Sequence, residues 1–326
     1  MRVDLQECRF RAAAGFRLLA GLVWIFCLLA GCSPRAIMIG EYRKIMASGL
    51  ASFERDDDLD MLQQAFPANI KLLEAMLASD PDDPGLLILL SRMYASYTFL
   101  FLEAQLDSAN LEAPDAGGPT SAGGDPEIIK AALNRNYLKG AGYALAALSQ
   151  RRPHSAQRLS KVNQVPDYLA SLGREDVPAL FWYGFNLGTW IHRNMDSVQA
   201  IAKANVAERV MKRVLELEPE YYHGSAHLFL LGFYASRPPM LGGNLEAALH
   251  HYQALRKIAG EDFLMARLYY ARYVLPMKQD RRSYEKMLSA IIQEATDNPT
   301  TRYRLLNLVA ARRARNFLIL GDRLFE

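Results

Sequence analysis

Apolar residues along this chain recur with the period of an α-helix, and this periodicity is the feature that most limits the possible fold. Val206, Val210 and Val214 share one helical face, and Leu288 and Ile291 share another. The sequence contains no sustained run of alternating, β-branched residues of the kind that forms a half-buried strand. Hydrophobic residues make up 51% of the chain, which is ample for a buried core. The sequence therefore predicts an all-α protein.

Prolines divide the helical segments, and two of these divisions resemble each other. The segment LLEAMLASDP, residues 72–81, precedes a helix that contains Tyr-Ala-Ser at 94–96. The segment VMKRVLELEP, residues 210–219, precedes one that contains Tyr-Ala-Ser at 234–236. A helix, a proline turn and a second helix, repeated along a chain, are typical of an α-solenoid. We therefore expect an α-solenoid-like array of helical hairpins similar to tetratricopeptide repeats (TPR).

The second hairpin matches the spacing of a tetratricopeptide repeat. Leu228, Leu231 and Gly232 stand at positions of its first helix, and Ala248 and Tyr252 stand at positions of its second. We expect Gly232 to let these two helices approach closely. Tyr252 is then expected to fill the space beside the glycine.

The N-terminal residues have the pattern of an export signal. A basic stretch is followed by the uncharged segment LLAGLVWIFCLLA, residues 18–30, which is short of the ~20 residues that a membrane span needs. Leu29-Ala30-Gly31-Cys32 then resembles the lipobox of bacterial lipoproteins. We predict a signal peptide over 1–31 and lipidation of Cys32, with an uncleaved signal anchor as the alternative. By resemblance to lipoprotein sorting in diderm bacteria, Ser33 rather than Asp after Cys32 favours the outer membrane, facing the periplasm.

Charge and cysteine content exclude several classes of function. The net charge is +3, and four arginines against two acids leave +2 in the leader, so the mature chain carries +1 and is not expected to bind nucleic acid. Cys8 and Cys27 leave with the signal peptide, so no disulfide is expected. The sequence has no phosphate-binding glycine loop and no GxSxG motif. We predict a protein that is not an enzyme and needs no cofactor.

Residues 32–326 are expected to form one all-helical domain with a flexible loop at about 107–126. The centre of that loop is APDAGGPTSAGGDP, residues 113–126, which is rich in glycine and proline.

Several short stretches, in their order and spacing, resemble the T component associated with TRAP (tripartite ATP-independent periplasmic) transporters, called TatT. These stretches are 177–182, 188–191, 215–219, 223–227, 234–238 and 241–243, together with Asn307 and the tail 322–325. The resemblance implies a periplasmic lipoprotein with cryptic tetratricopeptide-like hairpins. It also implies a homotrimer, a hydrophobic cleft or pore for a small hydrophobic ligand, and docking to the periplasmic solute-binding subunit.

An aromatic helix and a loop supply the candidates for the ligand cleft. The helix is unusually rich in aromatic residues, which combine a large apolar body with a polar tip; its alternative role is that of a central core helix. The loop 236–244 interrupts a hairpin where a plain repeat needs only a short turn. The candidates are Trp182, Phe185, Trp190, Tyr234, Ser236, Pro238, Gly242 and Gly243.

Histidines and arginines offer weaker signals. His223 and His227 are four residues apart, as two metal ligands on a helix can be, but no third ligand is evident and we expect packing or hydrogen bonding instead. His250 and His251 are expected at the surface. The arginines near the C-terminus are expected either to contact a partner or to be solvated; they are Arg302, Arg304, Arg312, Arg313 and Arg315.

Two further functions compete with a transporter accessory protein. A structural TPR-like envelope lipoprotein, which holds together a membrane-associated complex, is the alternative and needs no apolar tunnel. An envelope hydrolase would need a converging acid, base and nucleophile.

Overall fold

The computed structural model describes residues 34–112 and 124–325. The chain divides into two compact units between Met46 and Ala47, inside helix α2 (Pro34–Phe53). The described part of the first unit is the beginning of that helix. The predicted signal peptide and Cys32 lie outside the described residues, so both stay predictions.

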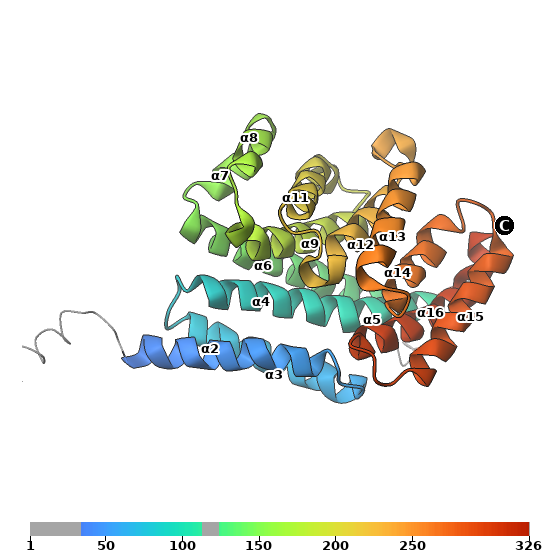
Figure 1. Ribbon diagram of the computed structural model, residues 1–326, viewed down its shortest axis with the longest axis horizontal. Helices are drawn as coiled ribbons and strands as arrows, with labels where there is room; N and C mark the ends of the chain where they lie inside the picture. The colour runs from blue at the N-terminus through green and yellow to red at the C-terminus, as the bar shows by residue number, and fades with distance from the viewer. Residues whose placement is uncertain (1–33, 113–123, 326) are drawn as a thin grey trace, which may run out of the picture. The chain divides into compact units, whose positions relative to one another are not determined.

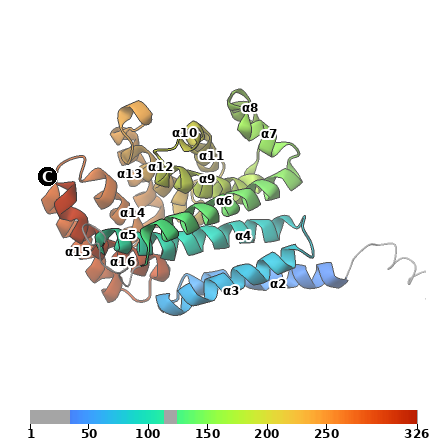
Figure 2. The same cartoon turned by 180° about the vertical axis from the view of Figure 1, so that it is seen from behind.

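The described residues form helices joined by turns and contain no strand, which confirms the all-α fold (Figures 1 and 2). In the second unit the α-helices are α3 (Leu59–Leu77), α4 (Pro84–Tyr97), α5 (Glu103–Glu112), α6 (Pro126–Arg151), α7 (Ser155–Ser160), α8 (Val165–Ala170), α9 (Val177–Arg193), α10 (Val198–Ala202), α11 (Ala204–Leu217), α12 (Tyr221–Ala235), α13 (Leu245–Ala259), α14 (Leu264–Tyr269), α15 (Arg281–Asp297) and α16 (Arg304–Leu324). The 3₁₀ turns are η2 (Val162–Gln164), η3 (Arg174–Asp176) and η4 (Pro239–Leu241), and the π-helical turns are η1 (Thr98–Leu102) and η5 (Tyr270–Val274).

Helix starts follow the sequence pattern of an acidic cap and a proline. Asp83 caps α4 by accepting from the backbone N–H groups of Gly85 and Leu86, and Pro84 occupies the first turn. Asp125 caps α6 in the same way, with Pro126 after it. Proline fits there because the first N–H groups of a helix have no partner within the helix.

Neighbouring helices pack along the chain in antiparallel pairs. Helix α4 packs between α3 and α6, α6 packs on α9, and α9 packs on α11, while α12 pairs with α13 and α15 with α16 (Figure 1). The pairs α3–α4 and α11–α12 coincide with the two similar sequence segments. The solenoid-like arrangement of such pairs stays a prediction.

The helix that approaches α12 most closely at Gly232 is not the one that the sequence predicted. A Cβ atom at Gly232 would lie 3.1 Å from the ring of Tyr269 in α14, so the glycine admits α14 and not α13. Tyr252 instead stacks on Tyr270, with 4.4 Å between ring centres. The expected close approach of α13 at Gly232 was wrong, because the residue spacing within one hairpin does not reveal that the later helix α14 packs against that hairpin.

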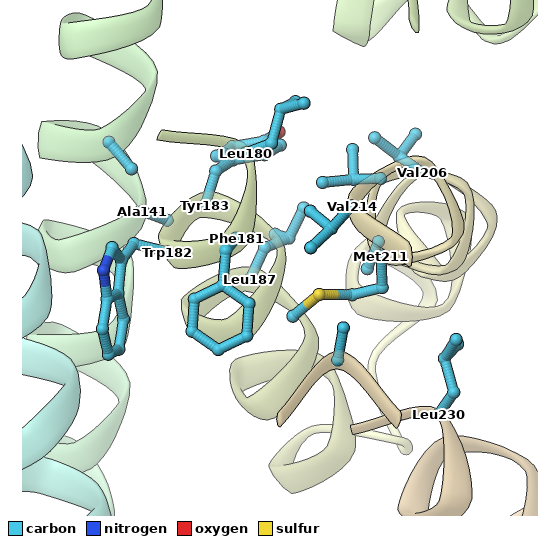
Figure 3. Packing of buried hydrophobic residues seen from close by; sticks show 14 of the residues in the cluster. Ala141, Leu180, Phe181, Trp182, Tyr183, Leu187, Val206, Met211, Val214 and Leu230 are labelled. Carbon is cyan, nitrogen blue, oxygen red and sulfur yellow. The ribbon is translucent and has the colours of Figure 1, made fainter. Parts of the chain in front are cut away.

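Helix α9 is the central core helix that the alternative interpretation anticipated. Phe181 and Leu187 lie toward Met211 of α11, while Trp182 lies on the other side of α9 (Figure 3). Trp182 is only 2% exposed. The aromatic richness of this helix therefore serves packing, and Phe185, which is half-buried, is available for more than packing.

The start of the predicted loop at residue 107 was wrong, because α5 continues to Glu112. Asp107 is buried and accepts a hydrogen bond from Arg313 Nε at 2.9 Å, which fixes this turn of helix. Residues 113–123 lie outside the described residues. By length and composition the stretch Pro84–Leu111 could cross a membrane, but 72% of its apolar window is buried inside the protein, as expected of a core helix.

Candidate ligand cavities

Two small cavities lie side by side among α4, α9, α12 and the two π-helical turns. The first, here called the Arg237 cavity, has a volume of about 40 Å³. The second, the Trp182 cavity, has a volume of about 30 Å³. Phe185 and Leu228 line both. These two side chains are therefore the partition between the cavities.

Helices α9 and α12 form the wall of the Arg237 cavity. Gly188 leaves room there for Phe229, whose ring would lie 2.1 Å from a Cβ atom at position 188. Gly232 makes similar room for Tyr269. Gly188 and Gly232 have no side chains, so the aromatic rings of Phe229 and Tyr269 occupy the space beside them and form the wall of this cavity.

Both π-helical turns contribute to the walls. Phe99 and Leu100 of η1 line the Trp182 cavity, and Tyr273 of η5 lines the Arg237 cavity. A π-turn adds one residue to a helical turn and is frequently found at functional sites. Two such turns therefore lie beside one pair of cavities.

The Trp182 cavity is almost entirely aromatic and aliphatic. The ring of Trp182 lies 5.0 Å from that of Tyr222 and 6.0 Å from that of Phe185. Tyr222 has a positive φ of 46°, as does His223 at 62°, in a left-handed turn that precedes the regular part of α12. Such backbone strain is typical of functional positions.

The Arg237 cavity adds polar groups to an aromatic wall. His192 Nε2 lies 3.1 Å from the hydroxyl oxygen of Tyr273, and His192 Nδ1 lies 3.2 Å from Ser236 Oγ. Burial lowers the pKa of His192 to about 4, and the positive charge of Arg193 acts in the same direction. His192 is therefore neutral at pH 7.

The carboxylate of Glu103, on the same wall, is already paired with neighbouring side chains. It lies 2.9 Å from Arg193 and 3.1 Å from Arg313, and it accepts a hydrogen bond from the hydroxyl of Tyr137 at 2.8 Å. Desolvation raises the pKa of Glu103, but the two arginines outweigh it and the pKa falls to about 2. The carboxylate is thus ionised and its charge is compensated.

Of the eight residues predicted from the sequence, Trp182 and Phe185 line the cavities and Ser236 contacts the lining residue His192. Trp190 is half-buried elsewhere on α9. The hydroxyl of Tyr234 donates to Glu208 Oε1 at 2.7 Å, outside both linings.

The three predicted loop residues lie beside the Arg237 cavity without lining it. Pro238 and Gly242 are exposed. Gly243 packs on the backbone of Arg237, because a Cβ atom there would lie 1.8 Å from the carbonyl oxygen of Arg237. The loop thus holds Arg237, which is not among the residues predicted from the sequence although it precedes the two prolines of this loop.

The histidines take different places from those that the sequence suggested. His227 Nδ1 and His251 Nδ1 lie 2.8 Å apart and both residues are buried. The hydrogen-bonding interpretation of His227 is confirmed, whereas surface exposure of His251 was wrong because His251 faces α12 across the hairpin. His223 lies 3.6 Å from Glu54. Within the described residues, no three His, Cys, Asp or Glu side chains converge as a metal site.

Residues 55–325 match the family described as TRAP transporter T-component. The chain belongs to this family. An uncharacterized protein of Treponema pallidum (strain Nichols) is 27% identical over 281 residues, which cover 81% of this chain and 79% of that protein. The resemblance found in the sequence is therefore confirmed. Membership gives this T-component a transport-associated role beside the other TRAP transporter subunits, in the periplasm or the cell envelope.

Proposed function

We propose that this T-component holds a small hydrophobic solute between α9 and α12 and docks the periplasmic solute-binding subunit of a TRAP transporter. It would do so as a homotrimer, anchored to the outer membrane through lipidated Cys32 and facing the periplasm. Binding would be passive, by burial of apolar surface without a covalent step.

The pair of cavities that share Phe185 and Leu228 is the observation that carries this proposal. At 40 and 30 Å³ each cavity suits a guest of about the size of water, whereas an organic solute needs more room. We propose that a solute displaces the half-buried ring of Phe185 and so joins the two cavities.

The proposal is tested by filling the partition. Leu228→Phe adds volume between the cavities, and we expect it to weaken binding of the neutral apolar dye N-phenyl-1-naphthylamine about tenfold, measured by fluorescence titration of the folded protein. Leu249→Phe is the matched control, because Leu249 is half-buried on α13 and lines neither cavity.

Equal dye binding by the wild type and Leu228→Phe would contradict a solute site at this place. Docking is tested separately, by sedimentation of the purified protein with the TRAP solute-binding subunit. A trimer that gains mass with that subunit is expected; a monomer that gains none would contradict the assembly proposed.

A further inference from the structure

Arg237 is a buried cation that no carboxylate of the described residues neutralises within 4 Å. The residue is 3% exposed, and its guanidinium carbon lies 3.5 Å from the ring centre of Phe233. Its Nε and Nη1 atoms are buried and find no hydrogen-bond partner in the described chain. Burying a charge without a partner costs several kcal/mol, on the order of the whole stability of some domains. A bound anion would remove that cost.

The other charged or titratable groups on the cavity wall do not supply the missing charge. Glu103 is held by Arg193 and Arg313, and His192 is neutral. Glu208 acts on Arg237 only from a distance, since its carboxylate accepts from Lys212 and the hydroxyl of Tyr234. The uncompensated charge on this wall is therefore positive.

Arg237 stays charged at neutral pH despite its burial. Desolvation lowers the pKa of Arg237 to about 10, and Glu208 offsets part of that fall. At pH 7 the guanidinium thus keeps its proton. It can donate to an anion through more than one N–H group.

The loop 236–244 holds the backbone of Arg237 in place. Gly243 N donates to the carbonyl oxygen of Pro238 at 3.1 Å, and Asn244 N donates to that of Tyr234 at 3.1 Å. The close fit of Gly243 on the Arg237 backbone ties the loop to the end of α12. Stacking on Phe233 occupies one face of the guanidinium, and Nε and Nη1 at its edge have no hydrogen-bond partner among the described residues.

We infer that the Arg237 cavity binds the anionic head of an apolar carboxylate, with Arg237 as the ligand for the head and Phe185, Leu228 and Phe229 around the body. This inference rests on the proposed function and adds to it the chemical class of the solute. A carboxylate suits the site because a planar guanidinium pairs with its two oxygens. The small volume beside Arg237 favours a small head group.

Three probes that differ only in the head group test the inference. Decanoate, decanol and decylammonium are titrated against N-phenyl-1-naphthylamine bound to the full-length protein. We expect decanoate to displace the dye at about tenfold lower concentration than decanol, and decylammonium to be weaker than both, because a charge-assisted pair adds to apolar burial.

Variants of Arg237 then test whether this residue causes the preference for decanoate over decanol. Arg237→Gln is expected to bring decanoate to the level of decanol while leaving decanol unchanged, and Arg237→Lys to keep part of the preference. Arg209→Gln is the charge-matched control, because Arg209 is exposed on α11, where its side chain donates to Asn205. Circular dichroism of each variant confirms the fold.

The outcomes separate the two proposals. Decanol that binds as tightly as decanoate to the wild type overturns the carboxylate inference and leaves an apolar solute site standing. A preference for decanoate that survives in Arg237→Gln overturns the role of Arg237. If neither decanoate nor decanol displaces the dye, the solute site itself fails and the inference fails with it. If Arg237→Gln does not fold, the comparison of the three probes on the wild type and on Arg237→Lys still tests the inference.

Discussion

Arg313 is buried in the interior of this fold, although arginine side chains usually lie at the surface. It is 3% exposed and pairs with Glu103 at 3.1 Å and with Asp107 at 2.9 Å, while Arg193 approaches the same two carboxylates. Two cations and two anions thus form a neutral cluster beside the Arg237 cavity. Its role is to join α5, α9 and α16, and to cancel the charge of Glu103 at the cavity wall.

Removing one cation from this cluster is expected to be costly. Arg313→Leu leaves two buried carboxylates with one arginine, and we expect the free energy of unfolding to fall by about 3–5 kcal/mol. The neighbouring change Arg312→Leu should cost less than about 1 kcal/mol, because the pair of Arg312 with the exposed Asp60 is screened by solvent. Urea denaturation of both variants measures the difference. Similar losses for the two variants would disprove the special role of the buried cluster.

At the scale of elements, α12 and α13 are joined by a buried histidine pair. One Nδ1 must donate and the other accept across 2.8 Å, so the accepting ring is neutral, and a proton on its Nδ1 would set two donors against each other. Desolvation lowers the pKa of both histidines, and for His251 the charges of neighbouring His227, His250 and Lys212 act in the same direction. Tyr234 stacks on His251 and completes the contact.

The pair is expected to make stability depend on pH. In the unfolded chain each histidine takes up a proton near pH 6.5, whereas the folded protein resists this. Stability is therefore fully present above about pH 6.5 and falls as the pH decreases. We expect the slope to flatten by about 1 kcal/mol per pH unit in the double variant His227→Leu, His251→Leu, measured by urea unfolding between pH 7.5 and 4.5. A double variant that keeps the wild-type slope would refute the prediction.

Helices were predictable because the residues that they bury recur along the sequence with the period of a helix. Val206, Val210 and Val214 are buried as a face of α11, as their period predicts. The π-turns were not predictable, since one inserted residue changes neither composition nor hydropathy. Arg237 was missed because, although Phe233 stands four residues before it, nothing in the sequence shows that the guanidinium would be buried without a carboxylate partner. Aromatic residues in α9 were identified, but which of them meet a cavity depends on the packing of other helices.

At the scale of the whole molecule, both cavities exist only when distant segments have packed. Ala95 of α4 and Leu306 of α16 line the same Trp182 cavity. The buried pair of Asp107 and Arg313 joins residues 206 positions apart. Partial unfolding of either end would therefore open the site, so solute binding should report on the folded state as a whole.

The membrane anchor is the last expected property of the whole molecule, and it depends on one thiol. The lipobox pattern predicts that Cys32 receives acyl chains, and several chains together anchor a protein stably whereas one alone is marginal. In cells fed a labelled fatty acid, the wild-type protein should carry label and enter the detergent phase of a Triton X-114 partition. Cys32→Ala should lose the label and keep the uncleaved leader. Cys27→Ala is the matched control, because Cys27 lies within the predicted signal peptide and its loss should leave labelling unchanged. Label that persists in Cys32→Ala would show that the anchor is attached elsewhere.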